Sequence, residues 1–362
     1  MVNIPRSTVT KPARHRATLK DVAREAGVSL SAVSYVINDN QHARRISAAT
    51  KQRIQRAAQK LGYKSDPIGR ALQRGYTNQV ILLIVSWNLA MSHAATAMAI
   101  SRAATAQGFE VTVQIAEDDA AAEAFLHRRA VHHLGGILVL WDSPAMRDSH
   151  LKELATEGVP VIDLLPDGPA PVSVVTSDRE QAFLIGTQHL LSLGHRQIGV
   201  ICDSVTRVKT TLRKLEGYRR ALREAGLAED AGLIENVAEF GFEGGQAGFK
   251  RLLARRPEVT GLVCINDAMA LGVIAAARAA GLNCPADISV LGFGDATEGT
   301  YFQPQLSTLA LSSKQVAERA IAAVRQARQE GHAPAVTLLV APELVIRQST
   351  GPAKPRPPTL PA

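Results

Sequence analysis

From residue 79 to about residue 349, short apolar runs alternate with Ala-rich amphipathic stretches of helix length. The clearest apolar runs, which we expect to be buried strands, are 80–85, 136–140, 198–202, 261–265 and 288–293. Strands that alternate with helices form parallel sheets through right-handed crossovers. The alternation runs once to about Leu165 and again from about Val174, so we expect two doubly wound α/β lobes.

Positive charge is concentrated at the N-terminal end of the chain. Residues 1–76 hold 15 basic and 4 acidic side chains, a net charge of +11, whereas the remainder holds 26 basic and 29 acidic ones, a net charge of −3. A charge block of this kind favours a polyanionic partner for the N-terminal segment and a different role for the rest.

The segment 18–63 is expected to be all-α, with two short helices at its start. Thr18 and Asp21 have the spacing of a capping box, and Gly27 suits the left-handed end of a first helix. Ser29 is a candidate cap for a second helix that runs to about Asn38. Ser47 is a candidate cap for a third helix that ends near residue 61.

The second helix has two unlike faces. Its apolar side is formed by Val33, Val36 and Ile37. Its other side carries Ser31, Ser34, Tyr35 and Asn38, with Leu30 at the border between solvent and core. Two helices joined by a Gly-containing turn form a helix-turn-helix, whose second helix enters the major groove of DNA. The alternative is a plain helical bundle, and the +11 charge favours DNA binding.

A fourth helical signal lies at 66–74, where Asp66 precedes Pro67 and Gly75 follows. A helix this short does not form alone in water, so we expect it only against a symmetry mate and a DNA groove. Leu72 would then wedge between base steps of the minor groove, and Arg70 is assigned to the same DNA contact. The alternative is a plain linker.

Five runs of sequence together resemble the lactose/galactose repressor (LacI) family. They are TLKDVAREAGVSLSAVSYVINDN with ISAATKQRIQRAAQKLGYKSDPIGRAL (18–40, 46–72), HLLSLGHRQIGVI (189–201), CINDAMALGVIAAARAAGL (264–282), PADISVLGFGD (285–295) and PELVIRQST (342–350). The resemblance implies a homodimer on a pseudopalindromic operator and a periplasmic-binding-protein-like core. Its two lobes would close on a small effector, most simply a sugar-like metabolite, and change the affinity for DNA.

The resemblance assigns base-reading positions to Leu30, Ser31 and Tyr35. With Leu72 as wedge, the complete expected DNA-binding set also contains Thr18, Ser29, Ser34, Asn38 and Arg70. The chain departs from the family pattern at Ala32, where Thr is usual, and at Tyr35, where Arg is frequent. Arg reads guanine with two hydrogen bonds and Tyr does not, so the half-site should differ.

Effector-binding residues are expected beyond the carboxyl ends of strands. In the first lobe these are Trp87, Asn88, Trp141 and Asp142; in the second they are Asn266, Asp267, Phe293 and Asp295. The resemblance adds Lys214, at a position where Arg is usual in the family, and Arg213 beside it. Each has a plainer alternative: the Trp rings pack against loops or a partner, Asp267 caps a helix, and Arg213 and Lys214 are solvated helix charges. Two departures argue against a typical sugar site, because Gly294 stands where Asp is common and Lys214 where Arg is usual.

The expected boundaries follow from these patterns. They are a disordered basic arm (1–17), the helix-turn-helix domain (18–63), the hinge (64–77), a first lobe (78–174 and 309–334), a second lobe (175–308 and 335–350) and a disordered Pro-rich tail (351–362). The tail has no leucine heptads for tetramer formation, so we expect a dimer.

Other classes of protein lack support in the sequence. No phosphate loop, nucleophile elbow, metal-ligand cluster or cofactor motif is present, so an enzyme is not expected. Cys202, Cys264 and Cys284 form no disulfide pattern, which fits the cytoplasm. The chain shows no signal peptide and no apolar run long enough for a membrane. A solute-binding protein without a DNA role remains the rival, and the basic headpiece argues against it.

Overall fold

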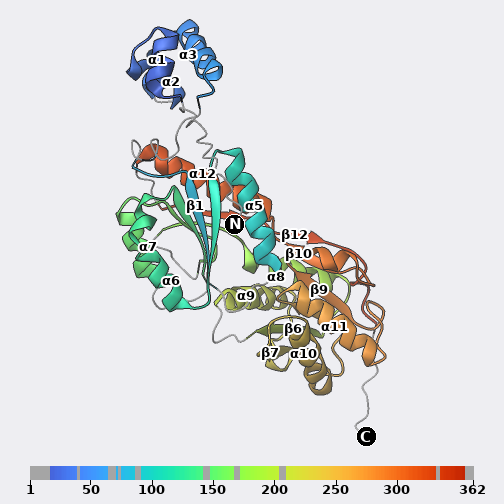
Figure 1. Cartoon of the computed structure of the whole chain (residues 1–362). Coiled ribbons are helices and arrows are strands. Elements are labelled where there is room, and N and C mark those ends of the chain that lie inside the picture. The colour runs from blue at the N-terminus through green and yellow to red at the C-terminus, as the bar shows by residue number, and fades with distance from the viewer. Residues whose placement is uncertain are drawn as a thin grey trace, which may run out of the picture. The chain divides into compact units, whose positions relative to one another are not determined.

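The computed structural model describes residues 17–38, 41–63, 71, 75–85, 91–141, 147–166, 172–203, 209–331 and 335–354. The chain divides into two units, Met1–Thr77 and Asn78–Ala362 (Figure 1). The predicted hinge residues Arg70 and Leu72 lie outside the described residues, as do Trp87, Asn88 and Asp142.

The first unit contains α1 (Leu19–Ala26), α2 (Leu30–Ile37), the 3-10 helix η1 (Gln41–Arg45) and α3 (Ala48–Lys60). The predicted caps are confirmed: Thr18 and Asp21 make both hydrogen bonds of a capping box, and Ser29 Oγ accepts from Ala32 N. Gly27 takes the left-handed conformation, with φ of 61°. These local signals fix the ends of α1 and α2.

A small core holds the three helices together. Val22, Val33 and Ile54 are fully buried, one from each helix, and small alanines pack around them. Val36 and Ile37 lie against this cluster, as the periodicity of α2 predicts. The opposite side of α2 is therefore left outside the core.

The second unit contains two six-stranded sheets. The first has the order β11-β5-β4-β3-β1-β2 and is parallel throughout. Its strands are β1 (Gln79–Val85), β2 (Glu110–Ala116), β3 (Gly136–Trp141), β4 (Val161–Asp163), β5 (Ser173–Ser177) and β11 (Thr337–Val340). Helices α5 (Met91–Ala106) and α12 (Ser313–Glu330) pack on each other, while α6 (Asp119–Leu126), η2 (Arg129–His133) and α7 (Arg147–Thr156) contribute to a separate core cluster (Figure 1).

The second sheet has the order β12-β10-β9-β8-β6-β7, and only the pair β10–β12 is antiparallel. Its strands are β6 (Ile198–Asp203), β7 (Ile234–Val237), β8 (Gly261–Cys264), β9 (Ser289–Phe293), β10 (Ser307–Ala310) and β12 (Glu343–Val345). Helix α8 (Arg179–Ser192) packs on α9 (Lys209–Glu224), and α10 (Phe242–Arg255) packs on α11 (Asp267–Ala279). The short 3-10 helices η3 (Ala231–Leu233) and η4 (Thr297–Thr300) lie between these elements. The prediction of two doubly wound lobes is confirmed.

The expected lobe boundaries need three corrections. Strand β10 belongs entirely to the second sheet, although the boundary after residue 308 would cut it. Strand β5 belongs entirely to the first sheet, although the boundary after residue 174 would cut it. Strand β11, expected in the second lobe with 335–350, instead pairs with β5, with Thr337 opposite Val174. The chain therefore passes between the sheets after β5, after β10 and after β11.

The start of the expected disordered tail is ordered against the second lobe. Gly351 N donates to Ser289 Oγ at 3.0 Å, and Ala353 N donates to the Leu193 carbonyl at 2.9 Å. These hydrogen bonds hold 351–353 beside β9 and the end of α8, so the prediction of disorder from residue 351 is wrong for this part.

Candidate functional site

The solvent-facing side of α2 carries the residues expected to read DNA. Leu30 is 44% exposed and lies outside the headpiece core. Of the two placements that the sequence left open, solvent or core, the structure therefore shows the solvent-facing one. Ser31 is also exposed. Thr18 and Ser29 are exposed residues whose hydroxyls act as helix caps.

Two contacts orient the remaining polar residues of α2. The Tyr35 ring lies 5.1 Å from the His42 ring, centroid to centroid, with the planes tilted by 44°. Asn38 Nδ2 donates to Ser34 Oγ at 3.3 Å, one turn earlier on the helix. Both pairs are partly exposed, so their polar atoms lie at the surface. The two contacts restrict the rotamers of these side chains.

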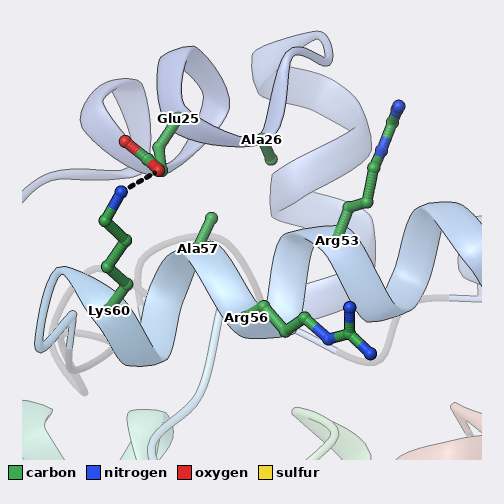
Figure 2. A pocket seen from close by; sticks show the side chains of 6 residues that line it. All are labelled: Glu25, Ala26, Arg53, Arg56, Ala57 and Lys60. Atoms are coloured by element: carbon green, nitrogen blue, oxygen red, sulfur yellow. Dashed lines mark hydrogen bonds and ion pairs between the residues drawn. The ribbon is translucent and has the colours of Figure 1, made fainter.

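Helix α2 has no charged residue, and the basic side chains lie on its neighbours. These exposed residues are Lys20 and Arg24 on α1, Arg44 and Arg45 on η1, and Arg53, Arg56 and Lys60 on α3. Figure 2 shows a depression where Ala26 and Ala57 face each other, with Arg53 and Arg56 extending from α3. Lys60 crosses to Glu25 in an ion pair of 2.7 Å (Figure 2). An uncharged helix packed beside elements that carry cations is the arrangement expected where base contacts and phosphate contacts come from different elements.

The second lobe gathers polar residues at the carboxyl ends of β6, β8 and β9. Lys214 of α9 is only 8% exposed, so it is not a solvated helix charge. Its Nζ donates to the Ile265 carbonyl at 3.2 Å and lies 4.4 Å from the centroid of the Phe293 ring. Arg213, its neighbour in the sequence, is exposed.

The Asn266–Asp267 pair begins α11. Asn266 Oδ1 accepts from Met269 N at 2.7 Å as the helix cap, while its Nδ2 is buried with no acceptor in the described part of the chain. Asp267 is buried and accepts from Thr308 Oγ1 and from Ala296 N, each at 2.6 Å. Burial raises the pKa of the Asp267 carboxyl, and these hydrogen bonds oppose the shift. Asn266, not Asp267, is the cap.

The loop after β9 holds Asp295 in a strained backbone conformation. Asp295 has φ of 57°, and its Oδ1 pairs with an Arg347 guanidinium nitrogen at 2.6 Å. Gly294 before it has φ of 126°, a region that L residues rarely adopt. Sequence reasoning missed Arg347 because 52 residues separate the two partners.

Asp203 is a further polar residue at this edge that the sequence reasoning missed. It ends β6, and its Oδ1 accepts from Thr211 Oγ1 at 2.5 Å. Its position directly after a buried run is the same signal that identified Asn266. Gly217, three residues after Lys214, lies inside α9.

Trp141 does not belong to the site as predicted. It is the last residue of β3 and is fully buried in the cluster that contains Leu151 and Leu154 of α7. Its Nε1 donates to Asp119 Oδ1 at 2.7 Å, which satisfies the one polar atom of the ring. The packing alternative therefore holds for this tryptophan.

The cysteines offer no reactive thiolate. All three are free; Cys202 and Cys264 are buried and Cys284 is partly buried. Burial raises the pKa of Cys202 to about 12, and it raises the pKa of Cys264 and Cys284 as well. Within the described ranges, no group of three metal-binding side chains is present. No helix described there is both long enough and apolar enough to cross a membrane.

A helix-turn-helix unit followed by two parallel-sheet lobes defines a class of effector-responsive DNA-binding regulators. Residues 18–66 match the family of bacterial regulatory proteins named lacI, and residues 187–350 match a periplasmic binding protein-like domain. The HTH-type transcriptional repressor PurR of Mannheimia succiniciproducens is 31% identical over 342 residues, which cover 92% of this chain and 98% of that protein. The chain belongs to the lacI family of DNA-binding transcriptional regulators.

Other similar proteins agree with this assignment. Catabolite control protein A of Priestia megaterium is 28% identical over 81% of this chain and 86% of its own. The structure of the regulator CelR with cellobiose has a TM-score of 0.69 and 26% identity, over 92% of this chain and all of that chain. The lac repressor dimer bound to operator has the same fold, with a TM-score of 0.73 and 24% identity over 93% of this chain and all of that chain. These relatives are regulators and not enzymes.

Proposed function

We propose that this chain is a cytoplasmic repressor that binds a pseudopalindromic operator as a homodimer and responds to a small-molecule effector. The observation that carries the proposal is the exposed, uncharged face of α2 between cationic neighbours. Phosphate contacts from Arg and Lys supply affinity for any duplex, and contacts from α2 to base edges supply the choice of sequence.

The reading face is built for contacts other than an Arg–guanine pair. Leu30 is exposed and suits a thymine methyl group, and the Ser31 hydroxyl both donates and accepts. Tyr35 presents a hydroxyl on a ring held by His42. The operator of this chain therefore differs from those of relatives with Arg at this position. Thr18, Ser29, Ser34 and Asn38 complete the proposed surface.

An apolar surface on the first lobe supports the homodimer. Val113 and Ile115 share a face of the edge strand β2 with Val111, which packs into the cluster covered by α5. Val113 and Ile115 are more than two-fifths exposed, and Met98 on α5 is 58% exposed. An exposed apolar group of this kind at a sheet edge is typical of a protein interface.

The effector assignment rests on the carboxyl edge of the second sheet. The similar regulator CelR binds cellobiose, and for this chain a small-molecule ligand is proposed at Lys214, Asn266 and Phe293. The alternative function is a solute-binding protein without a DNA role. In that case the same edge would bind the ligand, and the headpiece would not bind DNA.

Selection from a random duplex library tests the function. The full chain is expected to enrich two inverted half-sites, because a twofold dimer presents two copies of α2. A control variant, Leu30→Ala with Ser31→Ala and Tyr35→Phe, should enrich nothing. Recovery of no motif by the unaltered chain would favour the solute-binding alternative.

The dimer surface is tested separately by Ile115→Lys. A buried ammonium at a twofold interface faces its own copy, so we expect monomers by sedimentation equilibrium. Leu338→Lys at the opposite edge of the same sheet is the matched control, because Leu338 is similarly exposed and lies outside the proposed surface. Dimers in both variants would contradict the assignment.

A further inference from the structure

The carboxylates at the carboxyl edge of the second sheet are already engaged within the protein. Asp203 accepts from Thr211, and Asp267 accepts from both Thr308 and the backbone of Ala296. Asp295 is ion-paired with Arg347. Among the described residues, the carboxylates at this edge therefore have prior partners for their oxygens.

The donors at the same edge come from Asn266 and Lys214. Asn266 Oδ1 is committed to the helix cap, so Nδ2 is the amide atom left to donate, and it is buried without an acceptor in the described ranges. The Lys214 ammonium donates to the carbonyl of Ile265, the residue directly before Asn266. A buried ammonium thus contacts the residue that directly precedes the buried amide N–H group.

Two features strengthen the pull of this pair on negative charge. The Phe293 ring lies 4.4 Å from Lys214 Nζ and holds the cation in a weakly polar surrounding, where electrostatic attraction is stronger than in water. Gly294 contributes no carboxylate at this edge: its φ is 126°, and a Cβ there would make an ordinary contact of 3.5 Å with Asp267 Oδ2. An acidic side chain at 294 would be strained and would face a like charge.

We infer that the effector in the function proposed above carries an oxyanion, a carboxylate or a phosphate, which accepts hydrogen bonds from Lys214 and Asn266. The hydroxyl groups of a neutral sugar donate as well as accept, and the carboxylates at this edge already accept hydrogen bonds from the protein. A carboxylate or phosphate oxygen only accepts, and its hydrogen bonds from an ammonium are the strong, charge-assisted kind. Sugar acids and sugar phosphates are the classes that fit.

The test uses the full chain and the isosteric variant Asn266→Asp. Asp caps a helix as well as Asn does, so α11 keeps its cap while the buried donor becomes an acceptor. Thermal unfolding of the core is followed with acetate, inorganic phosphate and chloride at one ionic strength, and with glucose, glucuronate and glucose 6-phosphate. Arg223→Gln also makes the net charge more negative by one, but at an exposed position of α9, the helix that carries Lys214, and is the matched control.

The unaltered chain and Arg223→Gln should be stabilised by acetate or phosphate beyond the effect of chloride. In Asn266→Asp the apparent affinity should fall roughly tenfold or more, because a carboxylate would face the oxyanion. A larger response to acetate and glucuronate indicates a carboxylate ligand, and a larger response to the phosphates indicates a phosphate. Equal responses of Asn266→Asp and the unaltered chain, or stabilisation by glucose alone, would overturn the inference.

Operator binding separates this inference from the proposed function. If a neutral ligand alone changes operator affinity, the regulator proposal stands and the oxyanion inference fails. If an oxyanion binds through Asn266 and leaves operator affinity unchanged, the ligand class stands and the regulatory role fails.

Discussion

The headpiece and the second lobe use polar side chains in opposite ways. On α2, Ser31 and Tyr35 stand at a surface on a scaffold that packs without them. At the edge of the second sheet, Asp267 and Asp295 are tied to partners far along the chain. The headpiece therefore leaves polar groups at its surface, whereas the second lobe engages its carboxylates in contacts within the protein.

The largest effect is expected from a variant that unfolds the headpiece and leaves the second lobe folded. Ile54→Asp places an unpaired charge in the small headpiece core, which has few other residues to compensate. We expect loss of sequence-specific DNA binding, roughly a thousandfold or more, with an unchanged melting temperature for the core. Fluorescence anisotropy and calorimetry measure the two quantities.

The matched control for that variant is Gln55→Asp, which adds the same charge at an exposed position of α3. It should leave the headpiece folded. A fall in the core transition with Ile54→Asp would mean that the two units do not unfold independently.

Gly217→Ala should act on the second lobe alone. A Cβ at this position would lie 2.0 Å from the Glu180 carbonyl oxygen, so α8 and α9 would have to separate. Overpacking of this kind costs about 1–3 kcal/mol. Differential scanning calorimetry should show a lower core transition and an unchanged headpiece, and an unaltered core transition would show that the helices part freely.

The pH dependence of the core should follow His195. Its Nε2 lies 3.0 Å from the Gly351 carbonyl, which only accepts, so Nε2 carries the proton and Nδ1 accepts from Thr260. Burial is the main cause that lowers the pKa of His195 below 6.5. The unfolded chain then binds more protons just below pH 6.5, so stability should fall as the pH drops through this range.

His195→Gln keeps a donor and an acceptor and removes the titration. Its core melting temperature should depend less on pH between 7 and 5 than that of the unaltered chain. The raised pKa of Asp267 has the opposite sign and is common to both proteins, so it cancels in the comparison. If the melting temperatures of both proteins changed equally with pH, His195 would not be the group that causes the pH dependence.

The smallest expected effect is that of Tyr35→Phe. The ring keeps its place beside His42 and loses only the hydroxyl group. A single hydrogen bond contributes about 0.5–1.5 kcal/mol, so operator affinity should fall roughly two- to tenfold, while binding to scrambled DNA is unchanged. An equal loss on both duplexes would show that the hydroxyl contacts phosphate.

The headpiece was largely predictable because its signals are local. The caps at Thr18 and Ser29, the left-handed Gly27 and the faces of α2 each depend on neighbours within four residues. Strand alternation likewise predicted two parallel sheets. The place of β11 was not predictable, because its exposed edge position in the first sheet depends on pairing with β5 far earlier in the chain.

The position of the second-lobe site was predictable from the sequence. Which of its carboxylates are already engaged within the protein was not. A polar residue at a strand end identified Asn266, since ligands bind at this edge, and the family resemblance identified Lys214. A strand end does not specify the side on which a ring packs, so Trp141 was assigned wrongly. Which carboxylates are engaged depends on long-range partners such as Arg347 and Thr308.

The most direct test is the ratio of operator affinity to scrambled-DNA affinity, measured by anisotropy over a range of salt concentrations. Two variants are compared: one changes α2 through Leu30→Ala, Ser31→Ala and Tyr35→Phe, and the other carries Arg44→Gln and Arg45→Gln. The α2 variant should lose most of the ratio and keep its salt dependence, whereas the Arg variant should keep the ratio and show a smaller salt dependence. A preserved ratio in the α2 variant would contradict the assignment of α2 as the reading helix.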